Sequence, residues 1–516
     1  MKNPSENNKR VAKNTLFLYF RMILIMLVTL YTSRVVLAEL GINDYGIYNV
    51  VGGVVLMFSF LNSCMSTATQ RFLTFELGRG DTDRLKKVFA VALNIHIAIG
   101  SFIIILAETI GLWFVNEKLV ISEGRMVAAN WIYQFSILTF CINIIQVPYN
   151  AVLIAHEKMN VYAYISILEA LLKLGIVYLL VIVSADKLIV YGVLVFVVQL
   201  IIRIVYQIYC RKHYEESRFR LFWDKALYQQ MSGFAGWNLF GSVAWLMRDQ
   251  GVNIILNLFF GPAINAARGV ASQVSNAVMG FISNFQVALN PQITKDYAIG
   301  NITGMERLSY LGIKFSFLIL FTMAFPLCLN IDYVLHLWLV DVPDYAALFI
   351  ILIMIDALCG TLFGTPLMTS LSATGRIRNY QIVVSCIILC ILPTGYITLK
   401  LGCSAPSVFY ISIFFTLVSG FARFLFCRKQ IGYSLKKMVK DILLPIVGVS
   451  VVSLPLPVLV KYCWLNTSSF TNFILLCVIA IITTTIVSWF IGLKNNERST
   501  LVSIIKNKLD ECVKHT

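Results

Sequence analysis

Apolar runs of about twenty residues or more, separated by short polar segments, recur along the whole chain. A helix rises about 1.5 Å per residue, so about 20 apolar residues cross a hydrocarbon core of about 30 Å. Strands of a membrane barrel would instead alternate apolar and polar positions over about ten residues. The continuous runs therefore predict an all-α polytopic membrane protein.

Fourteen transmembrane helices are predicted, near residues 14–40, 45–75, 88–115, 126–155, 161–184, 188–210, 230–259, 264–294, 307–330, 346–371, 380–400, 406–427, 441–461 and 470–492. The loops between them are short, which leaves no room for a soluble catalytic domain, and no metal-binding or cofactor-binding motif is present in the sequence. We therefore expect neither an enzyme nor a bound cofactor. Residues 331–339 are apolar with a tryptophan near their end, which predicts a short amphipathic segment at the membrane interface.

The charge of the chain is distributed unevenly over the predicted loops. Charged residues make up only 13% of the sequence, against about 25% in soluble domains. An even number of spans places both termini on one side, and that side carries 28 Lys and Arg residues against five on the other. Cytoplasmic loops carry the excess of basic residues, so both termini are predicted to be cytoplasmic. Anionic lipid head groups account for this charge without a nucleic-acid partner.

A weak internal repeat is visible at an offset of about 220 residues. Leu40-Gly41 opens a helix that ends in Glu76–Gly80, and Phe260-Gly261 opens one that ends in Asp296–Gly300. Spans 1–6 and 7–12 are therefore predicted to form two six-helix lobes as parallel repeats, followed by two C-terminal helices. The predicted boundaries are an N-terminal lobe at 1–210, a cytoplasmic linker at 211–229, a C-terminal lobe at 230–427, extra helices at 428–492 and a cytoplasmic tail at 493–516.

Apart from charged residues within one residue of a span end, nine cations and four acids fall inside the predicted spans: Arg21, Arg34, Arg71, Lys173, Arg203, Arg248, Arg268, Lys314 and Arg423, with Glu108, Glu169, Asp249 and Asp356. An ionised group in mid-membrane costs about 2.5–3.5 kcal/mol on insertion scales, so each must face protein or water. Arg71, Arg203, Lys314 and Arg423 lie within about two turns of a cytoplasmic end, where long side chains can reach the head groups. We expect these four to snorkel.

The remaining cations are the candidates for substrate binding. Lys173 and Arg248 lie near mid-span, Arg34 and Arg268 lie nearer the outer end, and Arg21 lies nearer the cytoplasmic end, where it can also snorkel. Glu169 and Lys173 are four residues apart on one helix face, which favours an ion pair between them.

The intramembrane acids are candidates for coupling transport to H⁺ or Na⁺. Asp249 points about 100° away from Arg248 around the helix and is free to pair with a cation on another span. Asp356 and Glu108 have no partner nearby in the sequence. A carboxyl group in low dielectric takes up a proton readily, as proton coupling requires, and a buried acid hydrogen-bonded to a neighbouring helix is the structural alternative.

Several motifs carry a resemblance to a known family. The run 34–48 has Arg34, Leu40-Gly41 and Tyr45-Gly46 ahead of Tyr48. The run 261–271, Asn290-Pro291 and the outer Leu337-Trp338-Leu339 follow in the second half. Together they resemble bacterial polysaccharide exporters and the O-antigen (lipopolysaccharide) flippases of the multidrug/oligosaccharidyl-lipid/polysaccharide exporter superfamily.

This resemblance implies two lobes around a central cationic cavity and transport by alternating access. It implies a substrate as well, an oligosaccharide on an undecaprenyl pyrophosphate carrier that is moved across the bacterial inner membrane before polymerisation. Arg34, Arg248, Arg268, Lys173 and Arg21 are then expected to attract the pyrophosphate and sugar. Membrane lipids, a polysaccharide polymerase and the chain-length machinery are the implied partners.

Other functions stay open at the level of sequence. Nine cations against four acids favour an anionic cargo, but the excess nearly vanishes if the cations near span ends only snorkel. A cation-coupled multidrug antiporter and a flippase for the peptidoglycan precursor are therefore alternatives. A membrane polymerase or glycosyltransferase would carry catalytic carboxylates on a large outer loop, whereas the largest outer loop here holds only Asp332, Asp341 and Asp344.

Overall fold

The computed structural model describes residues 4–56, 59–117, 121, 124–218, 222–339, 342–463, 469–495 and 497–499. Over these residues the chain consists of helices and short loops and contains no strand. The all-α class predicted from the continuous apolar runs is confirmed.

Ten helical tracts within the described residues are long and apolar enough to cross a membrane. They are Thr82–Glu117, Met126–Ala155, Met159–Ile182, Lys187–His213, Ile302–Leu329, Ala346–Thr374, Arg378–Lys400, Ser407–Ile431, Leu435–Cys463 and Phe470–Gly492. The other four predicted spans coincide with α1 (Pro4–Leu56), α2 (Ser59–Arg79), α8 (Lys225–Phe260) and α9 (Pro262–Ala298). These four helices hold Arg21, Arg34, Arg71, Arg248 and Arg268, more than half of the intramembrane cations. Fourteen crossings stay a prediction.

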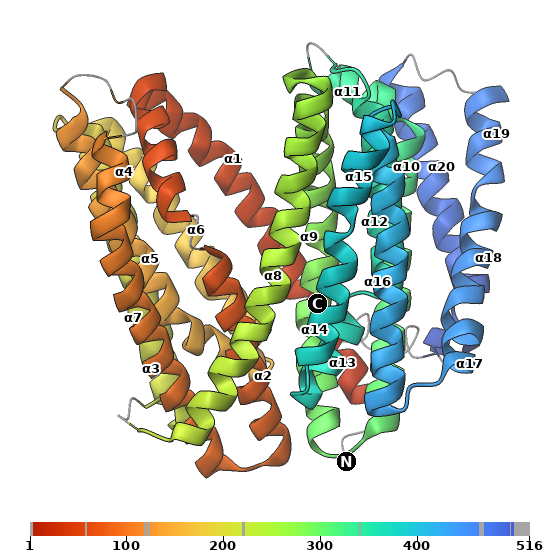
Figure 1. Ribbon diagram of the computed structural model, residues 1–516, viewed down its shortest axis with the longest axis horizontal. Coiled ribbons are helices and arrows are strands. Elements are labelled where there is room, and N and C mark those ends of the chain that lie inside the picture. Colours follow the sequence, from red (N-terminus) through yellow and green to blue (C-terminus); the bar gives the residue numbers. More distant parts are fainter. Residues whose placement is uncertain are drawn as a thin grey trace, which may run out of the picture. The chain divides into compact units, whose positions relative to one another are not determined.

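The chain divides into two compact units (Figure 1). One comprises residues 13–239 and the other comprises residues 240–516 together with residues 1–12. The division falls inside α8, beyond the predicted linker of residues 211–229.

Both units pack their helices in the same order. The first contains α3 (Thr82–Leu106), η1 (Ala107–Gly111), α4 (Leu112–Glu117), α5 (Met126–Ala155), α6 (Met159–Ile182), α7 (Lys187–His213) and η2 (Glu215–Ser217). The second contains α10 (Ile302–Leu329), α12 (Ala346–Leu362), α13 (Thr365–Thr374), α14 (Arg378–Leu389), α15 (Ile391–Lys400) and α16 (Ser407–Ile431). In the first, α5 packs against α2, α3 and α7, and α6 packs against α7. In the second, α12 packs against α9, α10 and α16, and α14 and α15 pack against α16.

The turns between helices repeat at the predicted offset. Gly41 (φ 76°, ψ 166°) divides α1, and Gly261 (φ 77°, ψ −174°) separates α8 from α9. Glycine is favoured at both because a positive φ is costly for residues with a Cβ atom. Forty residues after Gly41 and Gly261, Asp81 caps α3 and Asn301 caps α10, each by accepting a hydrogen bond from the backbone N–H three residues on. The weak echo in the sequence therefore marks two hairpins with the same backbone turns.

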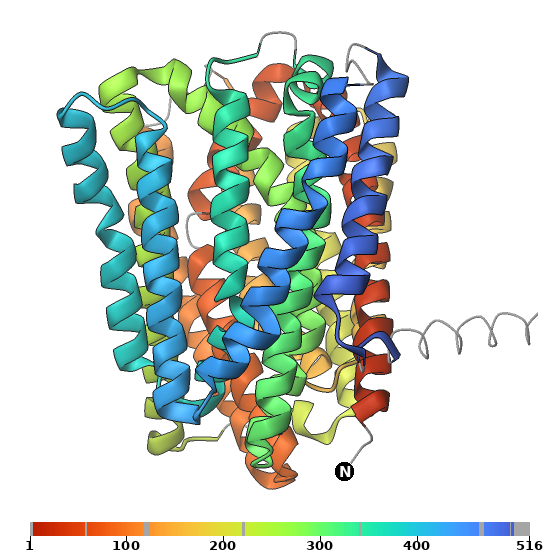
Figure 2. The same ribbon diagram turned by 90° about the vertical axis from the view of Figure 1, so that its right-hand side faces the viewer.

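The C-terminal helices lie on one flank of the second unit. They are α17 (Leu435–Met438), η3 (Val439–Leu443), α18 (Leu444–Ser453), α19 (Pro455–Cys463), α20 (Phe470–Val487) and η4 (Ser488–Gly492). Figure 2 faces this flank, where α18 and α20 (blue) pack against α10.

The segment predicted to lie at the interface is a short helix, α11 (Ile331–Trp338). Ile331 and Leu335 are buried, whereas Leu337 and Trp338 are exposed. The predicted amphipathic character is confirmed.

Candidate functional site

Arg248, a predicted substrate-binding residue on α8, forms an ion pair with α12. Its Nη2 atom lies 2.6 Å from Oδ2 of Asp356, and its guanidinium carbon lies 4.8 Å from the ring centre of Trp245. The side chains of Arg248 and Asp356 are only 11% and 21% exposed. The second carboxylate oxygen of Asp356 is buried and has no hydrogen-bond partner among the described residues. Arg248 is therefore neutralised by a carboxylate that is itself incompletely bonded.

The neighbouring residue, Asp249, pairs in the opposite direction. Its Oδ1 atom lies 2.6 Å from Nη2 of Arg268 on α9. The prediction that Asp249 pairs with a cation on another span is confirmed. Asp249 is 60% exposed, whereas Arg268 is 9% exposed. These two ion pairs contain two cations and two acids, so this group of four residues carries no net positive charge.

Arg21 on α1 is held differently. Its guanidinium carbon lies 4.6 Å from the ring centre of Tyr162, and Nη2 donates a long hydrogen bond of 3.5 Å to the Tyr162 hydroxyl. Nε of Arg21 is buried and has no hydrogen-bond partner among the described residues. A ring face attracts a cation by about 0.5–2 kcal/mol without cancelling its charge. No carboxylate pairs with Arg21 in the part of the chain that the structure describes, so its positive charge stays uncompensated there.

The other predicted residues of the first unit are partly engaged. Lys173 lies 2.7 Å from Glu169, which confirms the predicted pair on one helix face. Glu108 lies in the π-helix η1, and its Oε2 accepts a hydrogen bond of 3.1 Å from Gln134. Arg34 lies in α1, and its side chain falls outside the described residues.

The predicted snorkelling is wrong for three of the four cations near cytoplasmic span ends. Arg71 and Arg423 are each 8% exposed and Lys314 is 2% exposed. Arg423 donates a 2.6 Å hydrogen bond to the Phe363 carbonyl, Lys314 lies 2.9 Å from Glu497, and Arg71 lies over the Phe72 ring. Neighbouring helices bury these three side chains. The sequence of one span does not show which of its faces the neighbouring helices cover, so this burial could not be predicted. Arg203 is half-buried, with its guanidinium carbon 4.4 Å from the Tyr149 ring centre.

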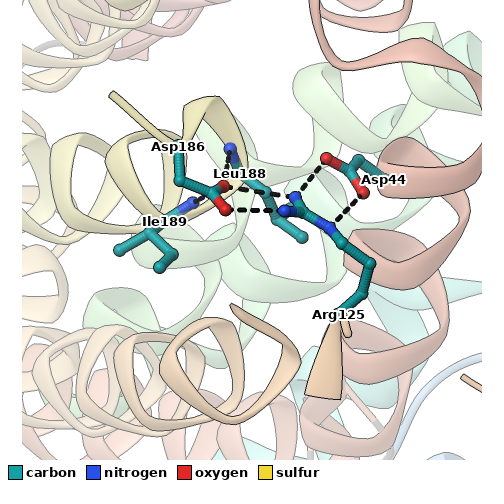
Figure 3. Close-up of polar contacts among 5 residues, drawn as sticks. All are labelled: Asp44, Arg125, Asp186, Leu188 and Ile189. Carbon is teal, nitrogen blue, oxygen red and sulfur yellow. Dashed lines mark hydrogen bonds and ion pairs between the residues drawn. The ribbon is translucent and has the colours of Figure 1, made fainter. Parts of the chain in front are cut away.

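One charged cluster was not anticipated from the sequence (Figure 3). Arg125, just before α5, lies between Asp44 and Asp186; Nε is 2.9 Å from Asp44 Oδ1 and Nη1 is 2.6 Å from Asp186 Oδ2. Lys187 follows Asp186 in the chain, and its Nζ atom lies 2.7 Å from Oε2 of Glu39. The cluster thus joins the start of α5 and of α7 to α1 on both sides of the Gly41 bend.

Electrostatics favour the ionised form of Asp186 in this cluster. Its hydrogen bonds from Arg125, and then from the backbone N–H groups at the start of α7, hold the pKa of Asp186 below its usual value. The position of Asp186 directly before a predicted helix is the sequence signal that could have found it, because aspartate is a favoured N-cap residue. Its partner Arg125, 61 residues earlier, is not visible in that pattern.

No group of three or more potential metal ligands occurs among the described residues. The charged groups described above include two Arg–Asp pairs in the second unit and a Lys–Glu pair in the first, where Arg21 and Arg203 lie against tyrosine rings.

Neither a family model nor a curated protein matches the sequence of this chain. Solved structures match its fold. An outward-facing multidrug resistance MATE family transporter of the MOP superfamily matches with a TM-score of 0.69 and 13% identity, over 84% of this chain and 98% of that one. A MATE protein in the straight conformation matches with a TM-score of 0.69 and 14% identity, over 82% and 96%.

A MOP superfamily transporter from Pyrococcus furiosus also matches, with a TM-score of 0.66 and 13% identity, over 85% of this chain and all of that one. The binding pocket of that protein has reverse polarity, which suggests a different function for that transporter. At such low identity the likeness establishes the fold alone. The chain has the fold of MATE transporters of the MOP superfamily.

Proposed function

We propose that the protein is a flippase that moves undecaprenyl-pyrophosphate-linked oligosaccharide units across the bacterial inner membrane. Alternating access of two lobes around a cationic cavity would carry the head group, while the lipid tail stays in the bilayer. The MATE fold supports transport, and the motifs at 34–48, 261–271 and 290–291 support the polysaccharide-exporter branch.

The observation that carries this proposal is the uncompensated guanidinium of Arg21. It rests on the Tyr162 ring, and its Nε has no hydrogen-bond partner among the described residues. A guanidinium offers a planar fork of donors that matches phosphate oxygens in pairs. A cationic drug would be repelled at this position, whereas a pyrophosphate would be attracted.

The pair of Arg248 and Asp356 is our candidate for ion coupling. A phosphate that takes the place of Asp356 beside Arg248 leaves that carboxylate without its cation in a largely buried site. Uptake of a proton by Asp356 would relieve this cost, so binding of the anion and of H⁺ would be linked. Na⁺ is the alternative coupling ion, with Asp249 and Glu108 as further candidates.

Multidrug export is a second candidate, because Asp249 is 60% exposed and presents a carboxylate to the surroundings. A cationic drug could bind there in competition with Arg268. The MATE fold is compatible with this function as well.

The test is flipping in liposomes that contain the purified protein. A fluorescent oligosaccharide on undecaprenyl pyrophosphate is placed in both leaflets, and its accessibility to an impermeant quencher is followed with time. We expect wild-type protein to flip it, Arg21→Lys to retain part of the rate and Arg21→Gln to lose most of it. Lys429→Gln is the matched control, because Lys429 is an exposed cation at the end of α16.

Two parallel assays decide between the candidates. Ethidium efflux from the same liposomes without flipping would overturn the proposal in favour of multidrug export. Equal or faster flipping of the peptidoglycan precursor than of the oligosaccharide carrier would overturn the substrate assignment while keeping the lipid-linked class.

A further inference from the structure

A charged pocket of about 290 Å³ lies in the second unit, where α10, the α17–η3 segment and the residues after η4 meet. Its wall includes four cations and three acids: Arg307, Lys314, Lys437 and Lys494, with Glu306, Asp441 and Glu497. Three of the cations are paired. Lys314 lies 2.9 Å from Glu497, Lys437 lies 2.7 Å from Glu306, and Lys494 lies 2.7 Å from Asp441.

Three of the four cations of this pocket lie nearer its surface than the acids, whereas the fourth, Lys314, is only 2% exposed and lies deeper. The side chains of Lys437 and Lys494 are 56% and 53% exposed, whereas their partners Glu306 and Asp441 are 10% and 26% exposed. Arg307 is exposed and has no carboxylate partner in the part of the chain that the structure describes. The rim is therefore cationic, and the acids lie beneath it, so an anion can approach the ammonium groups without facing the carboxylates directly.

The pocket lies at the level where an apolar surface begins. It is bordered by the first turns of α10 and of the α17–α18 tract and by the end of the α20–η4 tract, all candidate membrane spans. Phe490 and Leu444 nearby are 66% and 62% exposed, and Val439 is 39% exposed. Positively charged residues gather on this side of the predicted membrane, where anionic lipid head groups of the cytoplasmic leaflet lie.

Two π-helices border the pocket as well. η3 (Val439–Leu443) contributes Asp441, and η4 (Ser488–Gly492) ends two residues before Lys494. Single π turns inside helices are rare and frequently mark functional sites. Thus η3 places Asp441 in the wall, and Lys494 joins the wall just after η4 ends.

We propose that this pocket binds the phosphate of an anionic phospholipid of the cytoplasmic leaflet, held by Arg307, Lys437 and Lys494. The acyl chains would lie along the exposed apolar side chains of η3, α18 and η4. Basic pockets between helices on the cytoplasmic side are a recurrent way to hold such head groups. A free phosphate compound shares the head-group chemistry but has no use for the apolar surface. The proposal is independent of the transported cargo.

The test uses the full-length protein in a neutral detergent, with lipid binding measured by native mass spectrometry. Phosphatidylglycerol is the probe, phosphatidylcholine is the uncharged reference, and glycerol 3-phosphate is the soluble competitor. We expect Arg307→Gln to weaken phosphatidylglycerol binding roughly fivefold, since each cation near a membrane surface contributes about that factor. This variant breaks no ion pair among the described residues.

Asp441→Asn removes the acid beneath the rim and frees Lys494, so phosphatidylglycerol binding should become several times tighter. A purely structural ion-pair network predicts the reverse, namely lower thermal stability without tighter binding. Arg428→Gln is the matched control because Arg428 is an exposed cation at the end of α16, outside the pocket wall, and binding should stay unchanged.

Equal weakening by Arg428→Gln and Arg307→Gln would overturn the pocket, because it would indicate diffuse surface attraction. Equal binding of phosphatidylcholine would overturn the role of charge. Displacement of phosphatidylglycerol by an equal concentration of glycerol 3-phosphate would overturn the lipid as the ligand and assign the pocket to a soluble phosphate.

Discussion

The two units hold their intramembrane arginines against different partners. In residues 13–239, the guanidinium carbons of Arg21 and Arg203 lie 4.6 and 4.4 Å from the ring centres of Tyr162 and Tyr149. In residues 240–516, Arg248 and Arg268 each lie 2.6 Å from an aspartate oxygen. Arg423 is the exception in the second unit, because it donates to a backbone carbonyl and lies over the Tyr380 ring. Arg248 lies over the Trp245 ring in addition to its aspartate.

The two kinds of partner leave the arginines with different net charge, although the two units share their backbone turns. An aromatic face orients a guanidinium and leaves its charge intact, whereas a carboxylate cancels the charge and adds a group that can take up a proton. Since both units have the same turns and packing order, the contrast arises from side chains alone.

The largest effect is expected from breaking the buried pair of the second unit. Asp356→Asn leaves Arg248 charged and without an acidic partner in a site where it is only 11% exposed. Loss of one partner of a buried ion pair costs about 3–5 kcal/mol. The free energy of unfolding in mixed dodecyl sulfate micelles should fall by that amount.

A double variant tests whether the pair itself is responsible. Arg248→Gln combined with Asp356→Asn removes both charges and should recover most of the lost stability. Additive destabilisation in the double variant would contradict an ion pair and place the effect in packing around Trp245.

The next largest effect is expected when the aromatic partner of Arg21 in the first unit is replaced by a carboxylate, the kind of partner that Arg248 has in the second. Tyr162→Glu places a carboxylate where the ring now holds Arg21, so the guanidinium becomes neutralised in the same way as Arg248. If Arg21 attracts the pyrophosphate, flipping should fall by about 10- to 100-fold, the value of one or two charge-assisted hydrogen bonds.

Tyr162→Gln provides the control for this substitution, because it removes the ring without adding a charge. Loss of the ring alone should lower flipping about two- to fivefold, since the cation–π contact at such a site is worth about 0.5–1 kcal/mol. Equal loss in both variants would show that the ring, and not the free charge, matters.

Sequence reasoning reached the elements and the local pairs but not the long-range ones. The apolar runs located the helices, and Gly41 and Gly261 marked the repeated turns. The Glu169–Lys173 pair followed from helical spacing. All of these depend on residues close together in the chain.

What could not be predicted depends on which helices meet. Arg248 and Asp356 are 108 residues apart, and Lys314 and Glu497 are 183 apart. The sequence showed how far Lys314 lies from the end of its span, but not which face of the helix its neighbours cover. Lys314 was therefore expected to reach the head groups. The same limit affects the count of nine cations against four acids, because Glu497 of the tail was not among the four and neutralises Lys314.

A smaller effect separates the two Arg–Asp pairs of the second unit from each other. Asp249 is 60% exposed, so water screens its attraction to Arg268, and exposed pairs contribute only about 0–1 kcal/mol. Asp249→Asn should therefore change the free energy of unfolding by less than about 1 kcal/mol in the same micelle assay. A loss as large as that of Asp356→Asn would show that Asp249 is buried when the protein works.

At the predicted outer ends of the units the contrast is reversed. Arg125 precedes α5 and is held by Asp44 and Asp186, whereas Tyr345, 220 residues later, precedes α12 and stacks on Phe349. An ion-pair cluster in the first unit thus corresponds to a stacked ring pair in the second. Only the former arrangement should respond to acid.

The smallest effect we expect is this response to pH. In the folded protein the pKa of Asp186 is lowered below its usual value of 3.8, mainly by the hydrogen bond from Arg125. The ionised carboxylate therefore stabilises the fold at pH values above 3.8. As the pH falls below about 4, towards the lower folded pKa, this stabilisation is lost. Melting temperatures between pH 7 and 3 should fall less steeply below pH 4 for Asp186→Asn than for wild type. Asp332→Asn, at an exposed aspartate on α11, should follow wild type, and a parallel fall in all three proteins would remove the cluster from any role in acid sensitivity.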